Sequence, residues 1–236
     1  MYSFPPVAAA IGVLYSIVTG LAAAFTPLLG PASTVAAIIA FTVLVRIVLI
    51  PLGIVQARGE HTRARLLPKI QDLQRRYRAN RERLQRELVE MYRREGTSPL
   101  AGCLPALAQA PVFVVLYGLF LTPTVAGRPN QLLAGTLAGI PLDTRLAEVG
   151  LSAGLPVFAG LLALLALVAY VTRRTMPALP NPTATPAARF VRLLPFGTVL
   201  VAAVVPLAAG VYLLATTAWT AAERPLLRRL TEPPQG

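Results

Sequence analysis

The chain has 236 residues, of which 55% are hydrophobic and only 14% are charged, whereas a soluble domain carries roughly 25% charged residues. Its mean hydropathy is +0.62, and several uncharged stretches reach the roughly 20 residues that a membrane span needs. These values exclude an ordinary soluble domain and predict an all-α polytopic membrane protein.

The net charge of +12 is distributed unevenly along the chain. Residues 56–98 hold twelve basic and six acidic side chains, and the segments 173–192 and 223–236 add four and three arginines. The connection 123–152 holds two arginines and two acidic residues. By the positive-inside rule, the three basic segments are cytoplasmic and the balanced connection is external. The basic excess therefore predicts a topology and does not require a specific nucleic acid partner.

Cysteine usage and the amino-terminal sequence give further expectations. The single cysteine, Cys103, excludes an internal disulfide and cannot form a metal site by itself. No lysine or arginine precedes Arg46, and no early cysteine is available for lipid attachment. We therefore expect Met1 to be retained, and we expect neither a metal nor a cofactor.

The first apolar stretch, residues 7–25 within the segment 1–32, fits two positions in a membrane. It is long enough to be an extra span, but it is rich in alanine and glycine, which favours a helix lying in the outer interface. The prediction is an N-terminal interfacial helix, with a span as the alternative. Prolines and a glycine at 27–31 then break the helix. The segment 33–55 is predicted to be the first core span, with its apolar part ending at Pro51.

Residues 56–98 change to a charged helical pattern. Apolar residues recur there at spacings of three and four in two runs, with Asn80 as a turn between them. The pattern predicts a basic cytoplasmic two-helix hairpin, in which His61 stands alone. The two runs are Leu66, Ile70, Leu73 and Tyr77, followed by Leu84, Leu88 and Met91.

The remainder of the chain is predicted to alternate between spans and connections. The last apolar region is too long for one upright span, and Pro206 and Gly210 divide it into two. The predicted order is a second span at 99–122, an external loop at 123–152, a third span at 153–172, a cytoplasmic loop at 173–192, the fourth and fifth spans within 193–222, and a short basic cytoplasmic tail at 223–236.

Arg46 lies within the first predicted span. A guanidinium there costs about 2.5–3.5 kcal/mol on insertion scales, so we expect it to face a wet cavity. The alternative is an arginine near the helix end that reaches the cytoplasmic headgroups, since Pro51 is only five residues away. Thr42 lies one turn earlier on the same face and favours the cavity.

Other polar residues fall in the later spans. Gln109 lies inside the second span, and the last span carries Tyr212, Thr216, Thr217 and Thr220. Each alone is more often a helix-packing residue, but together with Arg46 they predict a hydrophilic pocket of positive character. They include no paired carboxylates, no nucleophile with a base and no ligand cluster. We therefore expect no catalytic residues and no enzyme activity.

Four blocks of the chain stand in a recognisable order. They are TVLVRIVLIPL at 42–52, LLPKIQDLQRRY at 66–77, MYRREGTSPLAGCLPALAQAPVFVVLYGLF at 91–120 and PLAAGVYLLATTAW at 206–219. The third block is the most specific, because a helix end, a glycine and proline break and a proline-rich span follow one another in it. In this order the chain resembles the YidC/Oxa family of membrane protein insertases over nearly its whole length.

The resemblance implies five core transmembrane helices around a hydrophilic groove that is open to the cytoplasm and to lipid and closed outside. It implies groove or substrate contact for Arg46, Thr42 and Tyr212, whereas Leu213 departs from the aromatic residue often found there. It also implies a short bacterial form without the large periplasmic domain. The implied location is the plasma membrane, and the implied partners are nascent membrane proteins, the Sec translocon, the ribosome and membrane lipid.

Two further hypotheses concern the hairpin and the pocket. The hairpin is predicted to contact ribosomes, targeting factors or incoming chains through Arg75, Arg76, Arg78, Arg81 and Arg83. The alternative is that these arginines have no such partner and only fix the topology or contact anionic lipid. For the chain as a whole, a small anion transporter or channel that uses Arg46 is the alternative to an insertase, and a scaffold that only binds other membrane proteins is a third class.

Overall fold

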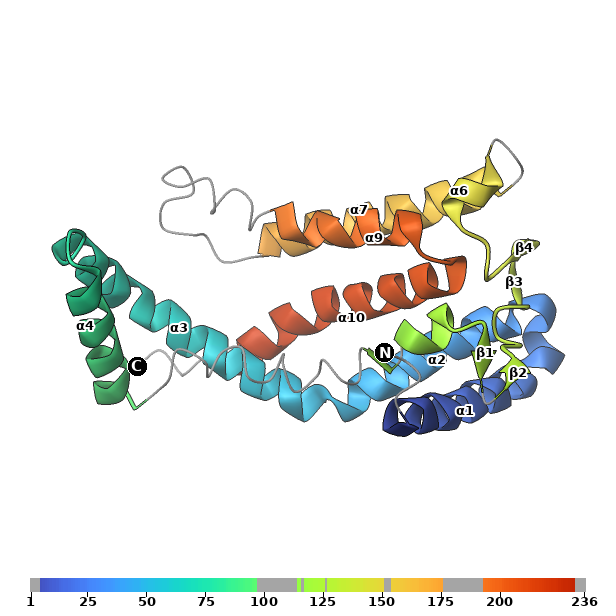
Figure 1. The fold of residues 1–236 in the computed structure, drawn as a ribbon, viewed down its shortest axis with the longest axis horizontal. Coiled ribbons are helices and arrows are strands. Elements are labelled where there is room, and N and C mark those ends of the chain that lie inside the picture. Colours follow the sequence, from blue (N-terminus) through green and yellow to red (C-terminus); the bar gives the residue numbers. More distant parts are fainter. Residues whose placement is uncertain are drawn as a thin grey trace. The chain divides into compact units, whose positions relative to one another are not determined.

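The computed structural model of the protein is mostly helical (Figure 1), as the sequence predicts. It describes residues 5–96, 114–115, 117–125, 127–150, 154–175 and 193–231. The chain divides into two compact units. Unit 1 comprises Met1–Val48 and Val112–Glu223, and unit 2 comprises Leu49–Pro111 and Arg224–Gly236.

Two antiparallel helices open unit 1. Helix α1 (Pro5–Leu29) is followed by a single turn of 3-10 helix, η1 (Gly30–Ala32), and then by α2 (Ser33–Val48). Gly30 adopts a φ of +52°, a conformation that glycine accepts without a steric penalty, so the chain reverses tightly here. Helix α1 therefore folds back along α2 (Figure 1).

The packed face of α1 repeats at intervals of three and four residues, as a helix packed along its length requires. Ile11 and Val18 on this face are buried, and further apolar residues of α1 pack around them. With 25 residues, α1 is about 37 Å long, which is sufficient to cross a bilayer.

The membrane position of α1 stays a prediction. The Tyr15 hydroxyl, in the middle of α1, accepts a hydrogen bond from the backbone N–H of Gln131 at 3.2 Å. Because Gln131 belongs to the connection predicted to be external, this contact favours the interfacial position. The length and the apolar composition of α1 fit a span equally well.

The helix of the first predicted span ends earlier than the sequence suggests. Helix α2 ends at Val48, and α3 (Ile50–Arg76) begins after the single residue Leu49. Pro51 lies in the first turn of α3, where the missing N–H of proline would have no helical partner in any case. The expectation that the apolar helix ends at Pro51 is therefore wrong, since this proline starts the next helix.

Unit 2 contains a helical hairpin. Helix α3 ends at Arg76, and α4 (Arg81–Arg94) begins after a turn in which Asn80 is the N-cap residue. The Asn80 side-chain oxygen accepts a hydrogen bond from the backbone N–H of Arg83 at 2.9 Å, which satisfies one of the free donors of the first turn. The chain thus turns where the sequence predicts.

The connection predicted at 123–152 is more ordered than expected, so the all-α description is incomplete. It holds two short antiparallel hairpins, β1 (Thr124–Val125) with β2 (Arg128–Pro129) and β3 (Thr136–Leu137) with β4 (Ile140–Pro141), and then the short helix α6 (Leu146–Val149). Positive φ angles at Gly127 and Gly139 allow the two tight turns.

Asn130 joins this connection to the end of the second predicted span by hydrogen bonds. Its side chain is 4% exposed. The amide nitrogen donates to the carbonyl oxygens of Leu119 and Thr122, at 2.8 and 3.0 Å, and the amide oxygen accepts from Leu132 N–H at 3.2 Å. A buried amide with its donors and acceptor satisfied holds a loop firmly.

Three further helices complete the fold, and the last of them belongs to unit 1 up to Glu223. They are α7 (Leu155–Thr175), α9 (Gly197–Val204) and α10 (Leu207–Thr231), and a 3-10 turn, η2 (Leu194–Phe196), precedes α9. Figure 1 shows α9 running beside α7, as the contacts between them require. The second predicted span is described only at its end, where the helix reaches Leu121.

The predicted division of 193–222 is right at one residue and wrong at the other. The chain breaks at Val205 and Pro206, but Gly210 lies inside α10. A Cβ atom added to Gly210 would lie 2.7 Å from Leu161 Cδ2 on α7, so this glycine allows a close helix contact. Helix α10 also continues to Thr231, into the segment 223–236 that was predicted to be only a tail.

The 123–152 connection also caps the beginning of α10. The backbone N–H groups of Leu207 and Ala208 donate to the carbonyl oxygens of Thr144 and Leu142, each at 2.9 Å. The first N–H groups of a helix lack partners within it, so these carbonyls complete the end of α10.

In the described part of the chain, two helical stretches are long and apolar enough to cross a membrane, Val7–Val48 and Leu155–Thr175. The stretch Leu194–Val204 is apolar but shorter than an upright span.

Candidate functional site

Arg46 lies in the last turn of α2, on the side that faces α10. Its side chain is half-buried. The Nε atom donates a hydrogen bond to Thr216 Oγ1 on α10 at 3.0 Å, and Nη2 donates to the same oxygen. One threonine hydroxyl therefore receives two N–H groups of the guanidinium and joins α2 to α10.

Tyr212 belongs to the same group of residues. It lies one turn before Thr216 on α10, is 2% exposed, and interacts with both Thr216 and Arg46. Its ring is tilted by 38° against the ring of Phe120, with 5.8 Å between the ring centroids. This arrangement suits an aromatic pair, and it places the end of the second predicted span beside the polar site.

Thr42 and Gln109 have different outcomes. Thr42 is buried one turn before Arg46 on α2, but its hydroxyl donates to the carbonyl oxygen of Ile38 at 2.7 Å. Its polarity is thus satisfied within its own helix. Gln109 lies outside the described residues. The structure therefore brings Arg46, Thr216 and Tyr212 together, with Thr42 nearby on the same helix.

The depth of the site follows from the position of Thr216 along α10. Thr216 follows Leu207, the end capped by the 123–152 connection, by nine residues or about 14 Å of helix. Thr231, the other end, is fifteen residues away. Arg46 therefore contacts α10 nearer the end that the 123–152 connection covers.

The sequence stretches that carry the site lack acidic residues. The stretches 5–59 and 149–222 contain no aspartate or glutamate, and the hydroxyls of Thr216 and Tyr212 are neutral. These stretches therefore offer Arg46 neutral hydroxyl groups and no carboxylate. An anionic group is the kind of ligand that a guanidinium in such a site would bind.

Several features were not predicted. Leu213, the residue that departs from the related pattern, is 5% exposed and packs in the core of unit 1. The indole N–H of Trp219 donates to the Glu223 carboxylate at 2.7 Å. The spacing of four residues signals this pair in the sequence, since side chains four apart share a helix face. The tilted aromatic contact between Phe120 and Tyr212 has no comparable signal.

The five predicted contact arginines lie near the turn of the hairpin, and all are exposed. Arg83 stands out, because its guanidinium lies 5.2 Å from the centroid of the Tyr77 ring. The Tyr77 hydroxyl donates to Glu87 at 3.4 Å. These contacts join the end of α3 to the beginning of α4. The arginines concerned are Arg75, Arg76, Arg78, Arg81 and Arg83.

The other end of the hairpin is joined through Glu95. Its carboxylate accepts from Lys69, and from Arg65 at 3.2 Å. The hydrogen bond from Lys69, with attraction from Lys69 and Arg65, holds the pKa of Glu95 below its ordinary value despite partial desolvation. Glu95 is therefore ionised at neutral pH and ties α4 to α3.

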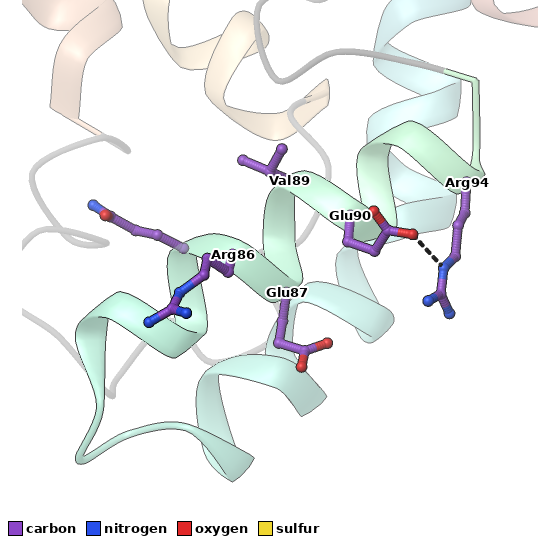
Figure 2. Close-up of a pocket in the computed structure, with 6 residues that line it drawn as sticks. Arg86, Glu87, Val89, Glu90 and Arg94 are labelled. Carbon is purple, nitrogen blue, oxygen red and sulfur yellow. Dashed lines mark hydrogen bonds and ion pairs between the residues drawn. The ribbon is translucent and has the colours of Figure 1, made fainter.

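A depression of about 550 Å³ lies beside α4, and Figure 2 draws the residues that line it. Its described lining combines acidic, basic and apolar side chains, and Glu90 accepts from Arg94 Nε at 3.1 Å. Within the described residues, no three His, Cys, Asp or Glu side chains are grouped as a metal site requires. The lining is Gln85, Arg86, Glu87, Val89, Glu90 and Arg94.

Comparison with known proteins gives one family. The chain matches the model described as "60Kd inner membrane protein" over residues 24–233. It is similar to proteins named "Membrane protein insertase YidC". In Streptomyces avermitilis the identity is 34% over 119 residues, which cover 47% of this chain and 28% of that protein.

Two other relatives with the same name are similar over shorter stretches. In Oceanobacillus iheyensis the identity is 37% over 95 residues, 38% of each chain. In Clostridium perfringens it is 38% over 89 residues, 38% of this chain and 37% of the relative. The aligned part thus amounts to less than two fifths of each relative. Because the family model covers most of its length, this chain belongs to the 60Kd inner membrane protein family, the YidC/Oxa family of membrane protein insertases.

Proposed function

We propose that this chain inserts nascent membrane proteins into the bacterial plasma membrane and helps them to fold. It acts alone or with the Sec translocon and uses a positively charged intramembrane groove around Arg46. Family membership supports this function. The observation that carries the mechanism is the half-buried Arg46, joined to Thr216 across two helices. Insertion moves a chain segment and breaks no covalent bond, so it needs no catalytic group.

The contact of Arg46 supports the groove over an arginine that reaches the cytoplasmic headgroups. Thr216 lies nine residues after Leu207 and seven before Glu223, so Arg46 donates to a residue in the middle part of the proposed span. An arginine that extends to the headgroups would be directed away from this residue. The two threonine hydrogen bonds also lower the cost of keeping a guanidinium in the span.

In the proposed mechanism, a client segment with a short acidic flank enters from the cytoplasm. Arg46 attracts the flank, and water in the groove shortens the apolar barrier. The flank then crosses only the outer half of the bilayer, while the apolar segment moves into lipid along the third and fifth spans, α7 and α10. A membrane potential adds roughly 2.3 kcal/mol per charge for each 100 mV.

The five-span core and its topology are part of the proposal. The spans are α2, the helix that ends at Leu121, α7, α9 with η2, and α10, with the hairpin and the carboxyl terminus in the cytoplasm. The distribution of arginine supports this orientation. Helix α9 is too short to cross upright, so we propose that the bilayer is thin there.

The partners proposed for the hairpin are ribosomes, targeting factors and incoming chains. Its exposed arginines favour acidic partners, among them RNA phosphates, whereas no feature reads a specific nucleic acid sequence. Anionic lipid is a further proposed contact of the basic segments.

Rescue of a cell depleted of its own insertase tests the function. We expect the wild-type chain to restore insertion. Arg46→Ala should lower insertion of acid-flanked clients roughly tenfold, about 1.4 kcal/mol, and Arg46→Lys should keep part of the activity. Arg128→Ala, which removes an exposed arginine of the external connection, is the matched control and should behave as wild type.

Two results would contradict the proposal. A well-expressed wild-type chain that fails to restore insertion would remove the functional claim. Equal insertion by wild type and Arg46→Ala across several acid-flanked clients would remove the groove role. Solute flux through vesicles without protein insertion would instead support the anion transporter.

A further inference from the structure

One face of α10 continues from the Arg46 site toward the carboxyl end of the helix. Tyr212, Thr216, Trp219 and Glu223 follow one another at spacings of four, three and four residues. Residues at these spacings lie on one face of a helix. Because Thr216 contacts Arg46, the same face presents a positive site first and a carboxylate two turns later.

Glu223 is held in place on that face. Trp219 and Glu223 are both half-buried, and the indole N–H donates to Glu223 Oε2 at 2.7 Å. This bond uses one carboxylate oxygen and leaves acceptor capacity on the other, since an ionised carboxylate accepts about four hydrogen bonds. Glu223 is also the first acidic residue after Glu148, so no other carboxylate stands on this helix before it.

The depth of Glu223 corresponds to the end of a membrane span. It follows Leu207 by sixteen residues, about 24 Å of helix, in a hydrocarbon core of about 30 Å. Tryptophan is enriched at the boundary between lipid tails and headgroups, which agrees with Trp219 lying one turn earlier. A client span that lies along α10 would therefore end near Glu223 on its cytoplasmic side.

We infer that Glu223 is a specificity-determining residue that pairs with a basic side chain at the cytoplasmic end of the client span. This inference rests on the proposed insertase function. Retained flanks of membrane proteins are rich in lysine and arginine, and a long basic side chain near a span end extends to the boundary. Arg46 and Glu223 then distinguish the two ends of a client by opposite charges on one helix face.

The test uses one single-span client in two versions, with lysine or glutamine as the residue after its span. Purified wild type and Glu223→Gln are placed in vesicles of neutral lipid, and insertion is measured by protease protection. Glu223→Gln should lower insertion of the lysine client roughly two- to fivefold, as expected for a partly exposed ion pair, and leave the glutamine client unchanged. Asp143→Asn, an exposed acid of the external connection, is the control and should change neither.

A charge exchange sharpens the result. Glu223→Lys should disfavour the lysine client and favour a version with glutamate after the span. Trp219→Phe keeps an aromatic ring but removes the donor, so it should lower the preference for lysine by a smaller amount than Glu223→Gln.

The outcomes separate this inference from the function on which it rests. Equal effects of Glu223→Gln on the lysine and glutamine clients, whether a loss in both or in neither, would overturn the pairing, because a structural role does not depend on the client's charge. Failure of the wild-type protein to insert either client would contradict the proposed function itself.

Discussion

At the scale of single residues, Arg46 and Thr216 show how a charge is kept within apolar helices. Threonine in a helix usually donates to a carbonyl one turn earlier, as Thr42 and Thr217 do. The Thr216 oxygen instead accepts two N–H groups from Arg46. A neutral acceptor stabilises the guanidinium without cancelling its charge, so the site remains attractive to an anion.

This contact leads to a prediction for Thr216→Val, which keeps the shape of the side chain and removes its oxygen. Insertion of acid-flanked clients should fall roughly fivefold, about 1 kcal/mol, because the guanidinium loses the acceptor that orients it. The loss should be smaller than in Arg46→Ala, since the charge remains. The measurement is client insertion in cells that contain only the variant.

Thr217→Val is the matched control, because the Thr217 hydroxyl bonds to carbonyl oxygens of its own helix. It should insert the same clients at the wild-type rate. If Thr217→Val and Thr216→Val were equally impaired, the loss would reflect the stability of α10 and not the orientation of Arg46.

Sequence patterns select most residues of this site but not their contacts. A lone arginine in an apolar segment and a polar stripe at helical spacing single out Arg46, Tyr212 and Thr216. The bond between Arg46 and Thr216 depends on how α2 and α10 align along their axes. That alignment comes from packing between segments 170 residues apart, and no local pattern records it.

At the scale of elements, the sequence predicts some helix breaks correctly and others wrongly. Prolines mark the breaks at Leu49 and Pro206, because proline removes a hydrogen bond and restricts the residue before it. Gly210 has no such effect, since glycine continues a helix wherever packing compensates for its flexibility. Its role is to admit Leu161 of α7.

We predict that Gly210→Val destabilises the protein by about 1–3 kcal/mol, the usual cost of overpacking. The added Cβ would lie 2.7 Å from Leu161 Cδ2, so α7 and α10 must separate or Leu161 must move. Thermal unfolding in detergent is the measurement. Gly160→Ala on α7, where an added Cβ meets nothing within 4 Å, should keep or raise the wild-type midpoint, because alanine favours a helix over glycine. A wild-type midpoint for Gly210→Val would show that the two helices do not pack closely here.

The 123–152 connection is the element least accessible to sequence analysis. Strands of two residues are too short for an alternating pattern. The turn at Ala138 and Gly139, both with positive φ, carries the small residues typical of hairpins. The link from Asn130 to Leu119 is a buried hydrogen bond. An asparagine in a loop is usually exposed, so the sequence does not predict this bond.

At the scale of the whole molecule, hydropathy and charge predict the order of the segments, because a bilayer imposes both. The basic residues of the hairpin also predict that it lies outside the membrane. Their excess over acidic residues leads to a prediction about its partners. Reversal of two charges near its turn, Arg81→Glu with Arg83→Glu, should weaken ribosome binding and slow insertion. Cosedimentation at increasing salt is the measurement.

The salt dependence identifies the kind of contact. Each basic contact to phosphate adds a slope near 0.9 for duplex or about 0.7 for single strands on a log-log plot, so the double variant should show a shallower slope than wild type. Arg93→Glu reverses an exposed charge at the other end of α4 and serves as the control. Unchanged binding and insertion in the double variant would leave the basic excess as a signal for topology alone.

The cap on α10 also constrains the order in which the protein itself is assembled. The carbonyl oxygens of Leu142 and Thr144 accept from the first N–H groups of α10, and the ribosome synthesises these two residues well before Leu207. If the 123–152 connection is external, it must cross the membrane and fold before the first N–H groups of α10 can find these acceptors. The final helix then closes onto a segment that has already been translocated.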